Sequence, residues 1–358
     1  MKRPSIRVKR VSHAACLFLA AAGCRHAASD ARLHVPMVTD EAEAVLAILE
    51  KRAAGQAPAE ADWQRLFSSD GYRRLKQREA SLQRPFEDST FRDFVLSADL
   101  LERAPALRGT LGAWVRVDPG EAARRAFAYL PDSAVIRAKV YPVIKPRTNS
   151  FVFEPRTNPA IFLYLDPKVA PAKLENILTH ELHHIGVGSV CPDEPAGLPE
   201  NTKMALSWMS GFAEGRAVLA AAGAPDVHPH ATSGAGERAV WERDFAKVGP
   251  DFLRLESFFT AITDGKLTEE ERTRQGMSFV STDEVPQGPY YTIGWLMSSV
   301  VERELGRKRL VESLCDSAMF LRDYNRAAQA GMSRGHASLP LWSDVLINRL
   351  SERLRHND

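Results

Sequence analysis

The chain has 358 residues, with 47 Lys and Arg against 45 Asp and Glu, which gives a formal net charge of +2. A chain of this length can bury a substantial core and can form two lobes. The near-neutral charge does not indicate nucleic-acid binding. Neither a Gly-rich phosphate loop nor the residue order of a Ser-His-Asp or Cys-His catalytic group stands out in the sequence.

Residues 1–23 have the features of an export signal. Basic residues at the start are followed by an apolar stretch, residues 14–22, that is too short to span a membrane. Small residues directly before Cys24 resemble the bacterial lipoprotein signal, in which this cysteine is acylated and begins the mature chain. We therefore expect a cell-envelope protein that is attached to the membrane only through a lipid on Cys24. Plain secretion after cleavage at an alanine is the alternative.

Loss of the signal changes the charge balance. The segment contains five basic residues and no acidic one, so the mature chain keeps 42 basic against 45 acidic residues, a net charge of −3. The positive charge of the full chain therefore belongs to the signal, which again gives no reason to expect a nucleic-acid partner.

The remainder divides into a tether (24–40), an N-terminal helical region (41–130), a central region (131–230) and a C-terminal helical region (231–358). The predicted fold class is α+β and mostly α-helical, with one small sheet. Apolar periodicity predicts helices at 61–67, 71–82, 86–103, 120–129, 252–263, 290–305 and 309–329, after a first helix that begins at Asp40. β-Branched runs predict strands at 134–136, 139–144, 151–153 and 160–165. Residues 231–236 and 265–288 are predicted to be loops.

The last predicted strand is followed by a helix that begins near Pro171, a residue tolerated in a first helical turn. Leu174, Ile177, Leu178 and Ile185 recur at helical spacing and predict its buried face. Gly186 and Gly188 are expected to end this helix.

This helix contains the sequence His180-Glu181-Leu182-His183-His184, an H-E-x-x-H motif. Residues four apart lie on the same helical face, so His180 and His184 can bind one zinc ion. Glu181 can reach a water molecule on that ion but is poorly angled to bind the metal, so we expect it to act as the general base.

Two histidines leave a catalytic zinc one protein ligand short. A third histidine in H-E-x-x-H-x-x-G-x-x-H is excluded, because Val187 and Val190 occupy the later positions. Residues 201–222 read as a second helix, which contains Glu214 thirty positions after His184 and between small residues. We expect Glu214 to be the third ligand.

Other residues near in sequence compete for this role. Glu194 and Glu200 are closer to the motif but lie in a Pro-rich segment, a less rigid base for a ligand. His228 and His230, in an H-P-H sequence, form a rival pair.

The motifs together resemble the gluzincin group of zinc metallopeptidases, and more closely bacterial families of zinc-dependent peptidases. The resemblance covers roughly residues 40–320 and rests on H-E-x-x-H, on Glu214-Gly-x-Ala, and on Tyr291-x-x-Gly294. It implies a zincin-like core with a small sheet beside the motif helix. Ala213 departs from the pattern, because an asparagine often stands before the glutamate, and the aminopeptidase motif for a free N-terminus is missing.

The resemblance implies a peptide or protein substrate and a residue that stabilises the negative charge on its carbonyl oxygen. Tyr291 is the first candidate and Tyr290 the second, although a tyrosine at a helix start is more often a packing residue. We expect His183 to pack behind the zinc ligands rather than to bind metal. The strand at 161–165 is a candidate edge for pairing with an extended peptide, or an ordinary interior strand.

An exported zinc metallopeptidase is therefore the leading prediction. A non-catalytic envelope lipoprotein with a structural or vestigial metal site is the alternative, and a zinc hydrolase acting on a non-peptide amide is a third. Cys191 and Cys315 remain after processing, an even pair that can form a disulfide in an oxidising compartment. Interference of Cys191 with the metal is the other possibility for that residue.

Overall fold

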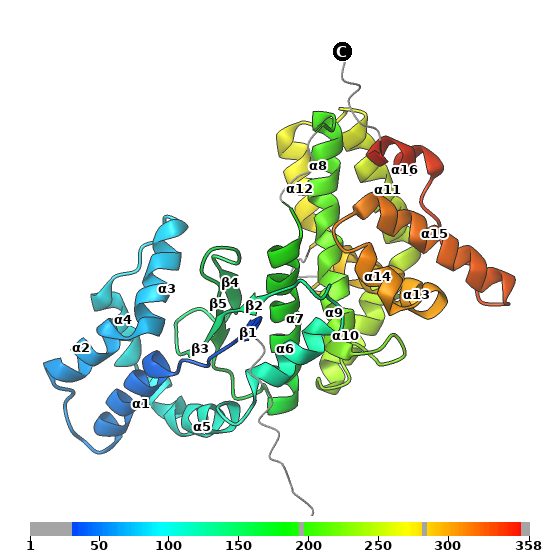
Figure 1. Cartoon of the computed structure of the whole chain (residues 1–358). Helices are drawn as coiled ribbons and strands as arrows, with labels where there is room; N and C mark the ends of the chain where they lie inside the picture. Colours follow the sequence, from blue (N-terminus) through cyan, green and yellow to red (C-terminus); the bar gives the residue numbers. More distant parts are fainter. Residues whose placement is uncertain (1–30, 193–196, 281–284, 352–358) are drawn as a thin grey trace, which may run out of the picture. The chain divides into compact units, whose positions relative to one another are not determined.

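The computed structural model describes residues 31–192, 197–280 and 285–351. Helices account for most of these residues and two small sheets for a few, which confirms the predicted α+β, mostly helical class (Figure 1). The helices that precede the main sheet are α1 (Asp40–Ala53), α2 (Glu60–Ser68), α3 (Asp70–Ser81), α4 (Asp88–Val95), α5 (Ala98–Trp114) and α6 (Pro119–Phe127).

The helices that follow the sheet include α7, which contains the H-E-x-x-H motif, and α9, which contains Glu214. Their bounds are α7 (Pro171–Val190), α8 (Glu200–Met209), the 3-10 turn η1 (Ser210–Phe212), α9 (Ala213–Ala222), α10 (Ala235–Phe245), α11 (Val248–Thr263) and α12 (Glu269–Ser278). The last helices are α13 (Pro289–Leu305), α14 (Arg307–Glu312), α15 (Ser317–Ser333) and α16 (Asp344–Ser351).

The main sheet has the strand order β3 (Lys139–Val143), β5 (Ala160–Tyr164), β4 (Phe151–Phe153). Strand β5 pairs in parallel with β3 and antiparallel with β4, so both of its edges are occupied. The idea that this strand offers a free edge to a peptide substrate is therefore wrong, because its backbone groups already have partners. A second small sheet pairs β1 (Leu33–His34) with β2 (Ile136–Arg137).

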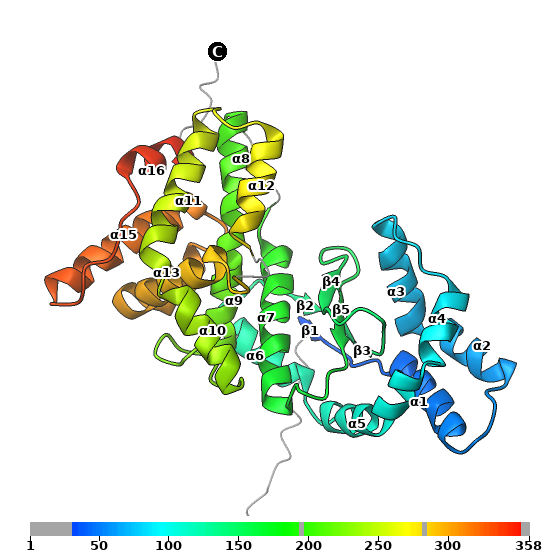
Figure 2. The same cartoon turned by 180° about the vertical axis from the view of Figure 1, so that it is seen from behind.

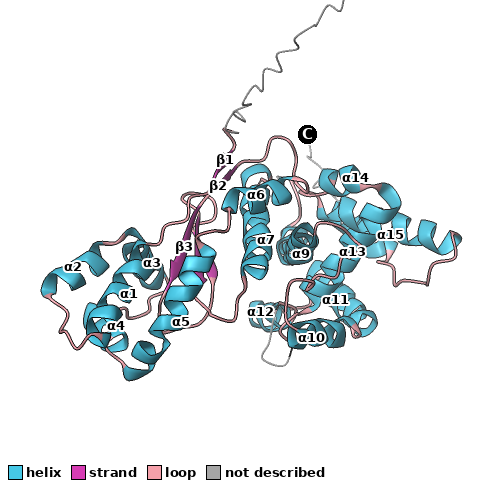
Figure 3. Cartoon of the chain, turned by 90° about the horizontal axis from the view of Figure 1, so that it is seen from below, coloured by secondary structure: helices cyan, strands magenta, loops and turns pink. Residues whose placement is uncertain are grey.

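Helix α7 lies between two hydrophobic cores. Leu174, Leu178, Leu182 and Ile185 pack into a core built from the N-terminal helices and the sheet. Helix α9 contributes instead to a core that it shares with α11, α13 and α15. Figures 1 and 2 show α7 between the strands on one side and these C-terminal helices on the other, and Figure 3 shows α7 beside α9. The seam between α7 and α9 is therefore where the two cores meet.

Several predicted boundaries differ from the structure. Helix α7 does not end at Gly186 but continues to Val190, because Gly186 serves close packing: a Cβ there would lie 2.2 Å from the Leu130 side chain. The helix predicted over 201–222 is divided by η1, where the Tyr290 ring lies over Gly211. The predicted loop at 265–288 contains α12, which begins with a capping box of Thr268 and Glu271.

The predicted helices at 86–103 and 309–329 are each two helices, α4 with α5 and α14 with α15. The export signal and the first part of the tether, residues 24–30, lie outside the described residues. The rest of the tether includes β1, and its backbone hydrogen-bonds to the 136–140 segment from Arg32 onward. In the described part of the chain, no helix has both the length and the apolar character needed to cross a membrane.

Candidate metal centre

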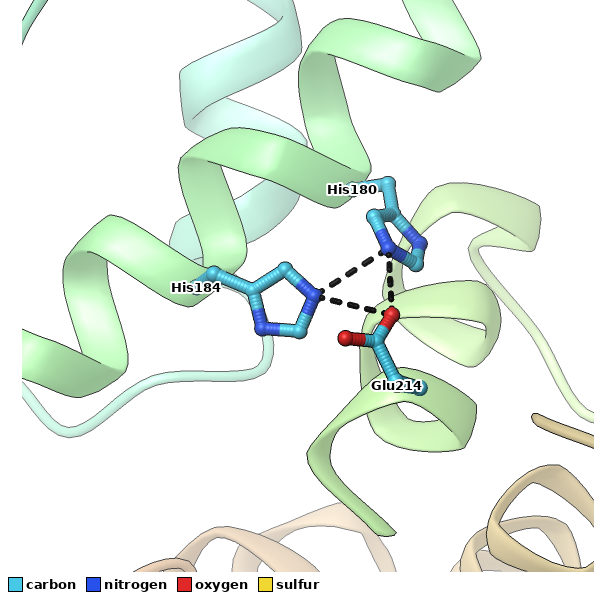
Figure 4. Close-up of side chains that lie close together, drawn as sticks. All are labelled: His180, His184 and Glu214. Atoms are coloured by element: carbon cyan, nitrogen blue, oxygen red, sulfur yellow. Dashed lines mark hydrogen bonds and ion pairs between the residues drawn. The ribbon is translucent and has the colours of Figure 1, made fainter. Parts of the chain in front are cut away.

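The structure brings three predicted site residues together on the facing sides of α7 and α9. His180 and His184 project from consecutive turns of α7, and Glu214 projects towards them from the first turn of α9 (Figure 4). All three side chains are partly buried. Among the described residues, they form the only group of three or more His, Cys, Asp or Glu side chains whose ligand atoms converge closely enough to hold a metal ion.

The distances fit a tetrahedral zinc ion. The two histidine Nε2 atoms are 3.1 Å apart, and Glu214 Oε2 lies 3.1 Å from His180 Nε2 and 3.3 Å from His184 Nε2. Ligand atoms about 2.0–2.1 Å from a tetrahedral zinc stand about 3.3–3.4 Å from one another. Two imidazoles and one carboxylate are also a ligand set that zinc uses in catalytic sites, with the fourth position left open. The three residues therefore suit zinc in both spacing and chemistry.

The electrostatics of the centre favour a cation. Burial tends to raise the pKa of Glu214, but the charge of His184 and hydrogen bonds from both histidines outweigh it and hold this pKa far below its usual value. Burial tends to lower the pKa of His184, and the carboxylates of Glu214 and Glu181 outweigh it in turn. Glu214 is thus ionised, as a metal ligand must be.

Glu181 and Tyr291 lie beside the three converging residues. Both line a cavity of about 270 Å³ that also reaches His180. The Tyr291 ring stacks parallel to the His180 ring, with centroids 6.3 Å apart and planes 9° apart, and its hydroxyl hydrogen-bonds to Glu214. Burial, followed by the charge of Glu214, raises the pKa of Tyr291, so the phenol stays protonated and remains a donor.

Tyr290 and His183 are placed elsewhere. Tyr290 is 1% exposed in the core around α13, with its ring against Gly211, so it does not reach the converging residues. His183 is fully buried behind the motif, and burial holds its pKa well below the ordinary value. Its imidazole hydrogen-bonds to the backbone of Tyr129, a packing arrangement rather than one suited to a ligand.

Of the competing third ligands that the structure describes, Glu200, His228 and His230, none belongs to the converging group. Glu194 lies outside the described residues. Glu200 begins α8 and lines a different cavity, beside Asp264 and Arg349. His230 lines the cavity next to Glu181, where its Nδ1 lies 3.2 Å from the Ser233 hydroxyl.

Two glycines set the position of Glu214. A Cβ on Gly215 would lie 2.1 Å from the Trp295 backbone nitrogen and 2.2 Å from the Gly294 carbonyl carbon. Helices α9 and α13 therefore cross in backbone contact at Gly215 and Gly294. Since Gly215 follows Glu214 and Gly294 follows Tyr291 by three residues, this crossing brings the two motifs together at the centre.

A disulfide and an arginine connect α7 and α9 to the segment between α14 and α15. Cys191, directly after α7, is bonded to Cys315, which answers the question of their pairing and excludes Cys191 as a free thiol near the metal. Arg216, two residues after Glu214, donates a 2.7 Å hydrogen bond to the Leu314 carbonyl and packs over the Phe320 ring. Both links end on the segment between α14 and α15.

Comparison with protein families gives a match over residues 120–331, to the family described as "Putative zinc dependent peptidase (DUF5700)". The chain belongs to this family. The match spans α6 to α15 and includes the H-E-x-x-H motif, Glu214 and Tyr291. No curated protein and no solved structure matches the chain.

Part of the site was not predicted from the sequence. Ile177 was expected on the buried face of α7, but it is partly exposed in the cavity beside Glu181. Val218 of α9 lines the same cavity. Their spacing could have indicated this position, because Ile177 is four residues before Glu181 and Val218 is four residues after Glu214, and residues four apart lie on the same helical face.

Proposed function

We propose that this chain is an exported zinc metallopeptidase that hydrolyses peptide bonds. The observation that carries the proposal is the triangle of His180 Nε2, His184 Nε2 and Glu214 Oε2, with edges of 3.1 to 3.3 Å, next to a cavity that Glu181 lines. A structural zinc site has no need of an adjacent carboxylate or an accessible cavity, whereas a hydrolase needs both.

His180, His184 and Glu214 would hold the zinc. When bound, zinc supplies Lewis acidity, which polarises a carbonyl group and makes water a stronger nucleophile at neutral pH. Glu181 accepts the proton of the attacking water and passes it to the nitrogen of the departing amine. Its place one residue after His180, on the cavity wall, keeps it near the reacting groups without occupying a ligand position.

Tyr291 donates a hydrogen bond to the carbonyl oxygen of the substrate as negative charge develops there. Its stacking on His180 fixes the ring, and its hydroxyl, which hydrogen-bonds to Glu214 in the structure, is already at the centre. A donor on a ring held in place in this way has only to turn its hydroxyl from Glu214 to the substrate oxygen in order to stabilise the transition state. Tyr290 has no part in this proposal, because it lies in the core.

We further propose that the protein works in the cell envelope with Cys24 as its lipid anchor. The basic and apolar segment before Cys24 supports export. The Cys191–Cys315 disulfide supports it independently, because disulfides persist in oxidising compartments.

The test of the peptidase activity is Glu181→Gln, compared with wild type on a mixed-sequence peptide library. The variant should keep zinc and lose at least about a hundredfold in rate, since general base catalysis contributes about 10²–10⁴-fold. Glu200→Gln, which removes a carboxylate exposed on α8, is the matched control and should keep full activity. Equal activity of Glu181→Gln and wild type would contradict the proposal. If the protein cleaved peptidoglycan amides and no peptides, its substrates would be non-peptide amides instead of peptides.

A further inference from the structure

The cavity beside Glu181 lies along the seam between α7 and α9. Its volume of about 270 Å³ is at the lower end of the range of small-ligand sites, roughly 300–1,000 Å³, and suits one side chain rather than a folded segment. The wall formed by α7 runs from Lys173 through Ile177 to Glu181, one turn at a time. The opposite wall contains Val218 of α9, one turn beyond Glu214.

Ile177 and Val218 are the largest aliphatic side chains that line this cavity, which Ala221 and Pro229 also line. Ile177 and Val218 are partly exposed, whereas Leu174, Leu178 and Leu219 on the same two helices are fully buried. Aliphatic surface that is exposed to water within a concave site is unfavourable, and an apolar group that covers it lowers the free energy. Both walls therefore favour an apolar occupant next to the metal centre.

The loop between α9 and α10 lines one side of the cavity and is held in place by a chain of polar contacts. Lys173 of α7 pairs with Glu237 of α10, and Glu237 also accepts hydrogen bonds from Ser233 and from the backbone of Gly234. Ser233 in turn contacts His230, whose ring packs against Trp241. This chain fixes the loop against α7.

The same contacts favour an uncharged side chain as the occupant of the cavity. Lys173 and Glu237 are the only charged residues that line the cavity away from the metal centre, among those the structure describes, and they neutralise each other. Burial lowers the pKa of His230, which is therefore neutral near pH 7. A charged side chain in this cavity would lose its hydration without gaining an unpaired partner of opposite charge, apart from Glu181 at the reacting end.

We propose that this cavity is the specificity pocket of the enzyme and receives an uncharged, apolar side chain of leucine or phenylalanine size from the residue next to the cleaved peptide bond. Ile177 and Val218 set its width, and the loop from Pro229 to Ser233 closes it. The inference rests on the peptidase function proposed above and adds the class of peptide that is cleaved.

The test compares cleavage preferences of wild type, Val218→Phe and Ile177→Ala on a mixed-sequence peptide library, with cleavage sites identified by mass spectrometry. Wild type should prefer Leu, Met or Phe at one position beside the cleaved bond. Val218→Phe fills the pocket and should lower kcat/KM for those peptides by at least about tenfold relative to peptides with Ala there, while Ile177→Ala should shift the preference towards larger residues.

Val187→Ala is the matched control, because Val187 is a partly buried aliphatic residue of α7 outside the cavity. Its preference should equal that of wild type, and zinc content should be the same in all variants. An unchanged preference in both pocket variants, or a wild-type preference for charged residues, would overturn the inference and leave the peptidase function intact. A wild type that binds zinc and cleaves no peptide would overturn the proposed function, and the pocket assignment with it.

Discussion

The crossing of α9 and α13 predicts a specific effect of Gly215→Ala. The added Cβ would lie 2.1 Å from the Trp295 backbone nitrogen, whereas non-bonded heavy atoms pack about 3.5–4.0 Å apart. Backbone atoms cannot rotate away, so the two helices must separate by more than about 1 Å. Overpacking costs about 3 kcal/mol in such a position, and the higher helix propensity of Ala returns about 1 kcal/mol. We therefore expect a net loss of about 2 kcal/mol in the free energy of unfolding.

The same substitution should weaken metal binding, because Glu214 moves with its neighbour. Zinc affinity measured by competition with a chelator should fall, while urea denaturation measures the loss of stability. Gly112→Ala is the control, since Gly112 lies within α5 and a Cβ there meets nothing within 4 Å. That variant should gain about 1 kcal/mol and bind zinc like wild type. Wild-type stability and zinc affinity in Gly215→Ala would refute the reasoning.

Three further predictions concern the disulfide, a buried acid and Tyr291. The Cys191–Cys315 bond spans 124 residues, so Cys191→Ser with Cys315→Ser should lower the free energy of unfolding by up to about 5 kcal/mol; denaturation unaffected by the double substitution would contradict this. Burial raises the pKa of Glu41 from 4.5 to about 8, so the folded state keeps a proton on this carboxyl that the unfolded state loses as the pH rises above about 4.5. The contribution of this proton to the free energy of unfolding is therefore lost as the pH rises from about 4.5 to 8. Wild type should therefore lose more stability than Glu41→Gln between pH 5 and 8, by a few kcal/mol in thermal or urea unfolding; parallel pH profiles would show that reasoning to be wrong. Tyr291→Phe should keep zinc and the fold but lower kcat more than it raises KM, by about 10²–10³-fold, and an unchanged kcat would remove Tyr291 from the mechanism.

Periodicity predicted most of the helices because their apolar residues recur with one spacing over three or more turns. Helices α1 to α3 begin within a residue or so of their predicted starts. Boundaries that depend on tertiary contacts were missed. Gly186 reads as a stop signal in the sequence, yet it lies within α7 because Leu130, more than fifty positions away, packs against it. No local pattern contains that information.

The three residues of the candidate metal centre could be predicted from the sequence, because a helix imposes the spacing of its two histidines. His180 and His184 are one turn apart, and Glu214 has small neighbours on a second helix, so three residues could be selected without coordinates. The structure brings these three together. The reason for the small neighbours could not be read from the sequence, because it lies in the contact of Gly215 with Gly294, 79 positions later.

The cavity beside Glu181 was not predicted from the sequence for a related reason. Ile177 and Val218 have the composition of core residues, and only the position of the loop from Pro229 to Ser233 leaves them facing an open space. The polar chain from Lys173 through Glu237 to Ser233 holds that loop, and it joins residues from separate helices. Pairings of this kind depend on the folded arrangement, because each partner alone reads as an ordinary surface residue.

The central claim, that His180, His184 and Glu214 hold a zinc ion, is tested most directly by the metal content of the purified mature protein. Mass spectrometry should find about one zinc per chain in wild type and in Glu200→Ala, whose carboxylate is exposed on α8, and little or none in Glu214→Ala. Zinc retained by Glu214→Ala at the wild-type level would contradict the assigned ligand set. Absence of zinc from wild type, even after loading, would contradict the account of the site as a whole.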